Sequence, residues 1–353
     1  MTKEKLYVFQ WISDLGGADT RLKDLLILLS SHYEITCIPN DIGRLQEKHN
    51  TSFLDKYGIS YKMLDSLPKK LTGYAYSNCN FRIFSEKNRI QFIKDSGLKL
   101  LWSNDMMWHT PDELDSIRRN LVDVVLYTSA FHRGMLHKDV ASANNLQKTF
   151  VIENYFDADS WPFLERKDRG TTVFGKVSRD DIMKYSDNFP MFYDQVTDGL
   201  DVEYSILGWS DKLSAKYGKW YKFTDKWRLY ASSALPTAEW LLDLDVFLYN
   251  CNHKFIENQS RAIIESQLTG VPIIAPNKWN FANMIDHEES GFVYHDLTEA
   301  REYAKALSNY SLRYSMGKKA STSCRQKWCC KETAMKKWNT LIDLANKKME
   351  VAV

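Results

Sequence analysis

The first forty residues alternate between short apolar runs and one amphipathic segment. An apolar run at 6–12 predicts a strand, and a glycine-containing turn follows at 13–17. From 18 to 31, leucines recur at the spacing of a helix that buries one face. A second run at 34–38 predicts another strand. Strand, turn, helix and strand in this order form a βαβ unit, which predicts a parallel sheet.

The rest of the chain repeats this pattern in two groups. The strands predicted for the two groups are 98–102, 122–127 and 149–152, and then 172–175, 203–207, 246–249, 272–275 and 291–294. Residues 299–308 are predicted to be helical, and the tail at 329–348 is amphipathic around Trp338 and Leu341. We therefore expect an α/β protein with two doubly wound domains, residues 1–152 and residues 153–330. The helix within 331–353 is expected to pack back on the first domain.

Length and composition agree with this organisation. The 353 residues exceed the size at which one hydrophobic core stops growing. Apolar residues make up 44% and charged residues 26%, which is typical of globular proteins. No apolar run approaches the roughly 18 residues of a membrane span, and the first residues lack a signal-peptide pattern. The six scattered cysteines suit a reducing cytoplasm, and Cys324, Cys329 and Cys330 are interpreted as reduced thiols.

Positive charge is concentrated in one window. Residues 56–99 hold nine basic residues and three acidic ones, a net charge of +6, with tyrosines and phenylalanines interleaved. Basic groups bind phosphates and aromatic faces stack on bases, so this window is a candidate nucleic-acid surface, with Lys69, Lys70, Arg82 and Arg89 as its contacts. The alternative is a solvated face over an ordinary aromatic core.

The stretch 255–274 holds the most informative pattern. Ser260 can cap a helix that Gly270 ends, and a buried strand follows. Glu257 then stands just before the helix, and Glu265 lies about one and a half turns inside it. The start of a helix attracts anions, so a diphosphate can bind there with one carboxylate beside each of its substituents. The alternative is a pair of surface glutamates on an ordinary helix.

Several motifs in order resemble those of one enzyme family. The E-x7-E pair with Gly270-Val271-Pro272 after it is similar to that of the retaining GT-B glycosyltransferases of family GT4, which contains sucrose and mannosyl transferases. Further resemblances are the glycine turn Gly16-Gly17-Ala18-Asp19, the crossover at 151–157, Leu207-Gly208, and the tail at 279–292 with Glu288. Together they cover most of the chain. The resemblance implies two Rossmann-like domains that face each other across a cleft, with the acceptor site in the first and the nucleotide-sugar site in the second.

The resemblance also implies roles for individual residues. Glu257 would contact the hydroxyls of the donor sugar, and Glu265 would hold the ribose of the nucleotide. An arginine and a lysine of the family bind the donor diphosphate, and Arg179 and Lys184 are the candidates here. The family has its arginine directly after the glycine, where this chain has Lys176. Arg179 can instead form a surface ion pair with one of the two aspartates that follow it.

Three further positions follow from the same resemblance. His109 resembles the histidine of the first domain that reaches the donor sugar, although a lone histidine is as often structural. The turn at Gly16 and Gly17, together with the helix that begins at Ser260, would stabilise the departing phosphate. The mechanism implied is transfer with retention of the anomeric configuration.

Asp243-Leu244-Asp245 spells the D-x-D metal motif of a different glycosyltransferase fold. It directly precedes an apolar run, and we interpret it as the entry to a strand. We therefore expect no metal site and no cofactor beyond the nucleotide-sugar co-substrate, for which UDP is preferred over GDP or ADP.

The acceptor has three alternatives. The basic, aromatic window and the Lys/Asn/Asp-rich composition resemble phage enzymes that glycosylate 5-hydroxymethylcytosine in DNA, which would make duplex DNA a partner and the host cytoplasm the location. A cell-surface glycan or lipid is the second acceptor. The third alternative is a catalytically silent nucleic-acid-binding protein on a GT-B scaffold.

Overall fold

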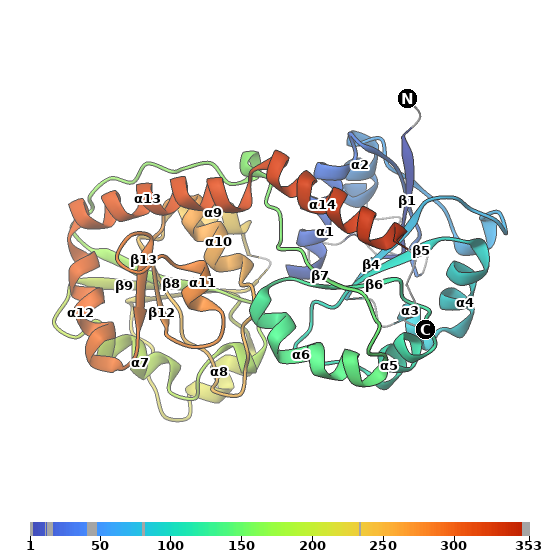
Figure 1. Cartoon of the computed structure of the whole chain (residues 1–353). Helices are drawn as coiled ribbons and strands as arrows, with labels where there is room; N and C mark the ends of the chain where they lie inside the picture. The colour runs from blue at the N-terminus through green and yellow to red at the C-terminus, as the bar shows by residue number, and fades with distance from the viewer. Residues whose placement is uncertain are drawn as a thin grey trace. The chain divides into compact units, whose positions relative to one another are not determined.

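The computed structural model describes residues 3–10, 12, 17–40, 48–79, 82–232 and 234–347, without the side chains of residues 48 and 49. The chain divides into two compact units (Figure 1). Unit 1 comprises Met1–Asp157 and Cys330–Val353, and unit 2 comprises Ala158–Cys329. Each unit is built on one parallel sheet with helices between its strands.

Unit 1 contains a seven-stranded parallel sheet in the order β3-β2-β1-β4-β5-β6-β7. Its strands are β1 (Glu4–Val8), β2 (Tyr33–Cys37), β3 (Ser60–Tyr61), β4 (Tyr74–Asn78), β5 (Lys99–Ser103), β6 (Val124–Tyr127) and β7 (Thr149–Val151). Its helices are α1 (Gly17–Leu29), α2 (Lys48–Lys56), α3 (Arg82–Ser85), α4 (Lys87–Ser96), α5 (Pro111–Arg118), α6 (Ala130–Ala143) and α14 (Lys331–Asn346).

Both faces of this sheet are buried because successive side chains of a strand point to opposite faces. In β1, Leu6 and Val8 belong to one hydrophobic cluster, and Tyr7 belongs to the other. The first cluster also contains residues of α1 and α14, and the second contains residues of α4, α5 and α6. Helices therefore cover the sheet on both sides, as in doubly wound folds.

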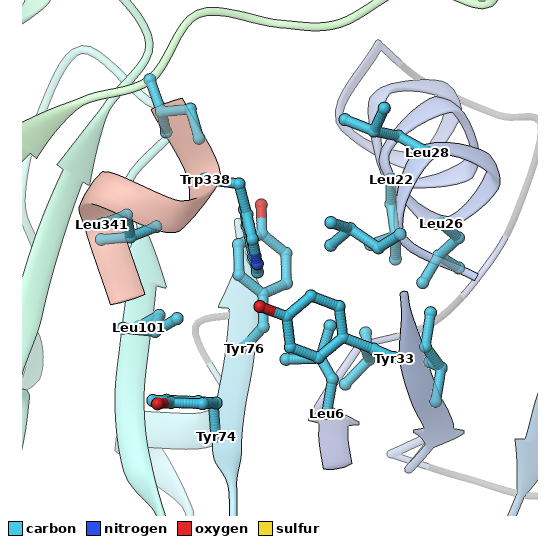
Figure 2. Close-up of a cluster of buried hydrophobic side chains, with 14 of the residues drawn as sticks. Leu6, Leu22, Leu26, Leu28, Tyr33, Tyr74, Tyr76, Leu101, Trp338 and Leu341 are labelled. Carbon is cyan, nitrogen blue, oxygen red and sulfur yellow. The ribbon is translucent and has the colours of Figure 1, made fainter. Parts of the chain in front are cut away.

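The last helix of the chain completes the core of unit 1. Figure 2 shows Trp338 and Leu341 of α14 beside the leucines of α1 and the tyrosines of the sheet. The ring centroid of Trp338 lies 6.2 Å from that of Tyr33 and 5.9 Å from that of Tyr76. Trp338 is 1% exposed, so the amphipathic pattern of the tail reports burial against this sheet.

Unit 2 contains a six-stranded parallel sheet in the order β10-β9-β8-β11-β12-β13. Its strands are β8 (Thr172–Val177), β9 (Val202–Leu207), β10 (Trp227–Tyr230), β11 (Val246–Leu248), β12 (Ile273–Pro276) and β13 (Gly291–Tyr294). Its helices are α7 (Phe189–Val196), α8 (Asp211–Tyr217), α9 (Thr237–Leu242), α10 (Arg261–Leu268), α11 (Phe281–Met284), α12 (Leu297–Ser308) and α13 (Tyr310–Trp328). A short 3-10 helix, η4 (Ile182–Lys184), follows β8.

The structure differs from the sequence-predicted elements mainly in the strands with tyrosine or tryptophan. β4 and β10 were not predicted, and the first strand ends at Val8 rather than at residue 12. Tyr74 and Tyr76 of β4 are 5% and 1% exposed, so they belong to the core and not to a stacking surface. The lysines that surround them in the sequence obscured the apolar character of this central strand.

Candidate functional site

In unit 2, the first glutamate of the E-x7-E pair lies in a buried polar cluster. Glu257 is 8% exposed, and its Oε2 accepts hydrogen bonds from Lys184 Nζ at 2.9 Å and from the Tyr249 hydroxyl at 2.5 Å. Lys184 ends η4 after β8, Tyr249 directly follows β11, and Glu257 is in the segment before α10. Three segments therefore converge where the strands end, which is where open α/β sheets bind ligands.

The ion pair of this cluster is mostly buried. Lys184 and Glu257 side chains are 16% and 10% exposed, so their charges are screened little by water. The Lys184 ammonium also lies 3.9 Å from the ring centroid of Phe255. Burial first, and then the charge of Glu257, raise the pKa of the Tyr249 hydroxyl, which stays a hydrogen-bond donor. The Oε1 atom of Glu257 makes no hydrogen bond to any residue that the structure describes.

The second glutamate lies inside α10. Glu265 is 8% exposed, and its Oε1 accepts a 3.0 Å hydrogen bond from Arg261 Nε one turn earlier in the helix. Ser260 is the N-cap residue, as its position predicts, but its side chain makes no capping hydrogen bond, so the expected cap by its hydroxyl is wrong. The first backbone N–H groups of α10 therefore have no partner from that side chain.

A glycine brings β9 close to the loop after β8. Gly208 has a φ of +103°, and a Cβ at this position would lie 1.7 Å from the carbonyl oxygen of Ser178. Its own carbonyl accepts a 2.9 Å hydrogen bond from the Tyr185 hydroxyl, next to Lys184. Only glycine fits here, which explains the strand-end glycine in the sequence.

Arg179, a candidate for the diphosphate, and Lys176, which stands where the family has its arginine, have different environments. Arg179 is exposed and forms no ion pair or hydrogen bond with the described residues, so the alternative of an ion pair to Asp180 or Asp181 is not observed. Lys176 is completely buried, and its Nζ donates hydrogen bonds to the carbonyl oxygens of Lys184 and Asn250.

Burial has a large effect on Lys176. It lowers the pKa of the Lys176 amine to about 7, with smaller opposing effects from Cys251 and Glu257 and a lowering effect from Lys184. The Nζ atom lies 4.5 Å from the Tyr249 ring centroid and 4.9 Å from that of Tyr185. Lys176 therefore joins the segments that carry Lys184 and Tyr249, and its amine has no contact with solvent.

In unit 1, the glycine turn falls only partly within the described residues. Gly17 is the first residue of α1, and Gly16 lies outside the described residues. Behind this turn, Arg21 of α1 forms a buried ion pair with Asp105. Asn78 Nδ2 donates to Asp105 Oδ2 at 3.1 Å, and the Ser103 hydroxyl donates to Oδ1 at 2.8 Å. The ends of β4 and β5 are thus tied to α1 by one polar network.

His109 lies next to this network in the loop after β5. Its side chain is 1% exposed, and its ring centroid is 5.8 Å from that of Trp102. Its Nδ1 atom lies 3.2 Å from Asn104 Nδ2 and 3.8 Å from Glu113 Oε2. The Nε2 atom is buried and has no hydrogen-bond partner among the described residues.

The basic window does not form one binding face. Arg89 is 7% exposed, and its guanidinium bonds to Glu86 and to the carbonyl oxygens of Pro39 and Asn40, so the expected phosphate contact by Arg89 is wrong. Lys69 and Lys70 are exposed. Lys70 Nζ donates to the carbonyl oxygen of Asp95 at 2.8 Å, in the last turn of α4.

The two exposed lysines lie near the N-terminal end of β4, and Arg82 lies near its C-terminal end. Lys69 and Lys70 come before β4, at the edge where the parallel strands begin. Arg82 is exposed and comes after β4, at the edge where the strands end. Ligands bind outside the carboxyl ends of such strands. Lys69 and Lys70 therefore lie at the N-terminal ends of the strands, opposite the ends where a parallel sheet binds an acceptor.

The D-x-D motif is engaged in structural contacts. Asp245 is 1% exposed, and its Oδ2 accepts hydrogen bonds from the backbone N–H of Val173 at 2.9 Å and from Arg169 at 3.1 Å. Its Oδ1 lies 3.7 Å from Arg313 Nε. The side chain of Asp243 is 63% exposed. Within the described ranges, no three histidine, cysteine or acidic side chains are grouped to hold a metal ion.

Two broader properties concern the whole described chain. All six cysteines are free thiols. None of the described helices is long and apolar enough to cross a lipid bilayer.

The sequence analysis missed two partners of the proposed sites. Tyr249 is the last residue of the predicted strand 246–249, and Asp105 comes three residues after the predicted strand 98–102. This position at the ends of parallel strands was the available signal. The contact of Asp105 with Arg21 joins residues 84 positions apart, and that of Tyr249 with Glu257 depends on the path of the loop between them, which spacing alone does not indicate.

Comparison with known proteins gives matches only to solved structures. No protein-family model and no curated protein matches the sequence. The chain is similar to HepE from Anabaena in complex with UDP-glucose, with a TM-score of 0.69 and 13% identity over 96% of this chain and 99% of HepE. It is also similar to a glycosyltransferase from Rickettsia africae, with a TM-score of 0.70 and 14% identity over 98% of this chain and 100% of the other. For sucrose-phosphate synthase from Thermosynechococcus elongatus, the TM-score is 0.69 and the identity 12%, over 97% and 99% of the two chains.

At these identities the likeness shows the fold. The α/β prediction is confirmed, because the chain has two parallel-sheet α/β units, of seven and six strands, and the GT-B fold of these solved structures.

Proposed function

We propose that this protein is a glycosyltransferase that uses a UDP-sugar and retains the anomeric configuration. The observation that carries the proposal is the cluster of Glu257, Lys184 and Tyr249 at the strand ends of unit 2, in which Glu257 lies just before α10 and Glu265 lies inside that helix. Buried charged groups that have a free acceptor atom are costly to maintain and cluster at functional sites. The GT-B fold, and structures of HepE with UDP-glucose and with UDP and glucose, support the choice of donor.

Each residue then has a chemical role. Glu257 Oε1 accepts a hydrogen bond from a hydroxyl of the donor sugar, while Lys184 and Tyr249 fix the orientation of the carboxylate. Glu265 accepts from the ribose hydroxyls. The unpaired guanidinium of Arg179, the Lys184 ammonium and the start of α10 stabilise the charge of the diphosphate. The bond from the anomeric carbon to the phosphate oxygen breaks, the acceptor oxygen bonds to that carbon on the same face, and the acceptor proton passes to the departing phosphate.

For the acceptor, we favour a glycan or a glycolipid hydroxyl over hydroxymethylcytosine in DNA. Arg89, Tyr74 and Tyr76 are buried, and the exposed Lys69 and Lys70 lie at the edge where the strands begin, which removes most of the support for a DNA surface. One similar structure is of WaaB, a lipopolysaccharide outer core galactosyltransferase, at 12% identity and a TM-score of 0.64. DNA remains the second candidate because Arg82 is exposed at the other edge.

The donor can be tested without knowing the acceptor. Thermal unfolding is measured with UDP, GDP and ADP and with their glucose derivatives, and slow hydrolysis of each sugar nucleotide is followed. A ligand at about 100 times its Kd stabilises the native state by about 2.7 kcal/mol, so UDP and UDP-glucose should raise the Tm by several degrees. NMR of the first product then gives its anomeric configuration. If no nucleotide raises the Tm and no sugar nucleotide is hydrolysed, the alternative of a catalytically silent nucleic-acid-binding protein replaces this proposal.

The acceptor is tested with labelled UDP-sugars in parallel reactions. The acceptors are a glycan and lipid panel, hydroxymethylated duplex DNA, and unmodified duplex DNA as the control. We expect label in the glycan or lipid fraction. Label confined to hydroxymethylated DNA would reverse our choice of acceptor and leave the donor proposal in place.

A further inference from the structure

The large apolar side chain with the highest exposed fraction in the described chain is a tryptophan. Trp108 is 55% exposed and lies between β5 and α5. Its indole makes no ring contact and no hydrogen bond with the described residues. Exposing an indole forgoes the stabilisation that burying this large side chain would bring, and most tryptophans of this protein are buried. An exposed position therefore needs an explanation outside folding.

Hydrogen bonds from buried side chains fix the loop that carries Trp108. The amide nitrogen of the buried Asn104 donates to the carbonyl oxygen of Trp108 at 3.0 Å, and Asn104 Oδ1 accepts from the backbone N–H of Met106 at 2.9 Å. The carbonyl oxygen of Met106 lies 2.8 Å from Nε2 of His132, which is completely buried. The loop is therefore anchored to the sheet and to α6 by backbone contacts that do not depend on the indole.

The far end of the loop is fixed as well. Thr110 and Glu113 form a capping box at the start of α5, in which the backbone N–H of Thr110 donates to Glu113 Oε2 at 2.7 Å. Trp108 is thus two residues from a rigid helix start. A rigid loop that presents an aromatic side chain outward is a preorganised binding surface.

The position and charge of the loop restrict the chemical class of ligand that it can bind. The loop follows the carboxyl end of β5, the edge at which sheets of this type bind ligands, and it is adjacent to His109. Residues 104–113 include Asp105, Asp112 and Glu113 but no lysine or arginine. A polyphosphate chain needs cations along its path, so this surface does not favour DNA. An indole face does bind the apolar C–H face of a neutral ring, and its N–H can donate to a hydroxyl.

We propose that Trp108 forms a stacking platform for a pyranose ring of the acceptor, so that the acceptor of this enzyme is a saccharide. The inference rests on the proposed glycosyl transfer and adds the class of acceptor and the residue that selects it. Asn104 and His132 act as positioning residues for the loop.

The test compares two reactions of the same enzyme. Hydrolysis of UDP-glucose without acceptor measures the donor site, and transfer to a panel of p-nitrophenyl hexopyranosides, in both anomers, measures the acceptor site. Trp108→Ala should raise the KM for the pyranoside by about tenfold or more, equal to at least about 1.4 kcal/mol, and leave hydrolysis within about twofold of wild type. Trp108→Phe, which keeps an aromatic face, should recover most of the loss.

The matched control is Trp220→Ala, which removes a 46% exposed tryptophan from unit 2. It should leave the KM for the pyranoside unchanged. Equal KM values for wild type and Trp108→Ala would overturn the inference, and so would hydrolysis without transfer to any pyranoside of the panel. Transfer to hydroxymethylated DNA that depends on Trp108 would assign the platform to a base instead. Absence of hydrolysis in the wild type is the separate result that would reject the proposed function, and the inference with it.

Discussion

Lys184 Nζ lies 2.9 Å from Glu257 Oε2, although the two residues are 73 positions apart in the sequence. The pair forms where the segment after β8 meets the segment before α10, and the Tyr249 hydroxyl contacts the same carboxylate oxygen. Each charge stabilises the other in a largely buried site, and one carboxylate oxygen stays available for a ligand. The charged groups of the site are therefore preorganised before any donor binds.

The first prediction concerns Lys184. Lys184→Met should lower the transfer rate by about 100-fold, because it removes a charge from the diphosphate site and leaves Glu257 without its cation. Loss of one partner of this mostly buried pair should also destabilise the fold by about 2 kcal/mol in urea unfolding. Steady-state kinetics with a UDP-sugar measures the first effect.

Lys216→Met is the control for this variant. Lys216 pairs with Asp187 at 2.9 Å in the same unit, but the Asp187 side chain is 72% exposed. Loss of an exposed pair should change the free energy of unfolding by less than about 1 kcal/mol and leave transfer intact. If Lys184→Met also transferred at the wild-type rate, the role of Lys184 in donor binding would be rejected.

The second prediction separates the two glutamates. Glu257→Gln should lower kcat by about 100-fold and change the Kd for UDP by less than about threefold, because the carboxylate is assigned to the sugar. Glu265→Ala should raise the Kd for UDP by about tenfold, through the loss of hydrogen bonds to the ribose. Calorimetric titration with UDP and single-turnover kinetics measure both. Glu302→Ala, an exposed position on α12, serves as control. Wild-type behaviour of both variants would contradict the donor-site assignment.

The third prediction concerns metal. Treatment with EDTA should leave the transfer rate within about twofold, because the diphosphate charge is assigned to Arg179, Lys184 and the start of α10. Asp245→Asn should instead destabilise unit 2 by about 2–3 kcal/mol, since it leaves the buried Arg313 without its carboxylate, while Arg169 keeps its ion pair with Asp243. Asp243→Asn, at an exposed side chain, should have little effect. Loss of activity in EDTA that manganese restores would contradict the assignment.

The sequence predicted the fold better than it predicted the surface. Strands such as 291–294 stand out because buried parallel strands are continuous apolar runs, and Glu257 and Glu265 stand out because their spacing is fixed by one helix start. The exposure of Arg89 could not be predicted in this way. Its place depends on the carbonyl oxygens of Pro39 and Asn40, which are about fifty positions earlier in the sequence. Contacts of this range are set by tertiary packing and leave no local pattern.

The fourth prediction tests what remains of the basic window. Three to five phosphate contacts would give a slope of roughly −3 to −5 for log K against log salt, at about −0.9 for each phosphate. We expect a slope close to zero for duplex DNA, and no change from Lys69→Ala or Lys70→Ala, because both lysines lie at the edge where the strands begin. Fluorescence anisotropy between low and moderate salt measures the slope. A steep slope that each of these substitutions lowers by about one unit would restore the DNA surface, and Arg82→Ala is the comparison at the other edge.

The last prediction concerns the buried lysine of unit 2. Burial lowers the pKa of Lys176 from 10.5 in the unfolded chain to about 7 in the folded one. Between these values the unfolded chain holds more protons than the native protein, so the free energy of unfolding rises with pH across this range.

Lys176→Met removes this dependence. The free energy of unfolding of the wild type, minus that of Lys176→Met, should therefore increase by about 2 kcal/mol between pH 7 and pH 9. Below pH 6 both states of the wild type are protonated at this site, and the difference should become constant. Urea unfolding of both proteins at a series of pH values measures it, and subtraction removes the contributions of the cysteines and tyrosines, which the two proteins share.

A difference that stayed flat from pH 6 to 9 would show that the native protein keeps Lys176 charged. The ammonium would then be held by its two carbonyl acceptors and by the rings of Tyr249 and Tyr185. If instead the difference rises, the proton must leave Lys176 near neutral pH, and the neutral amine still has the two N–H groups that these carbonyl oxygens require.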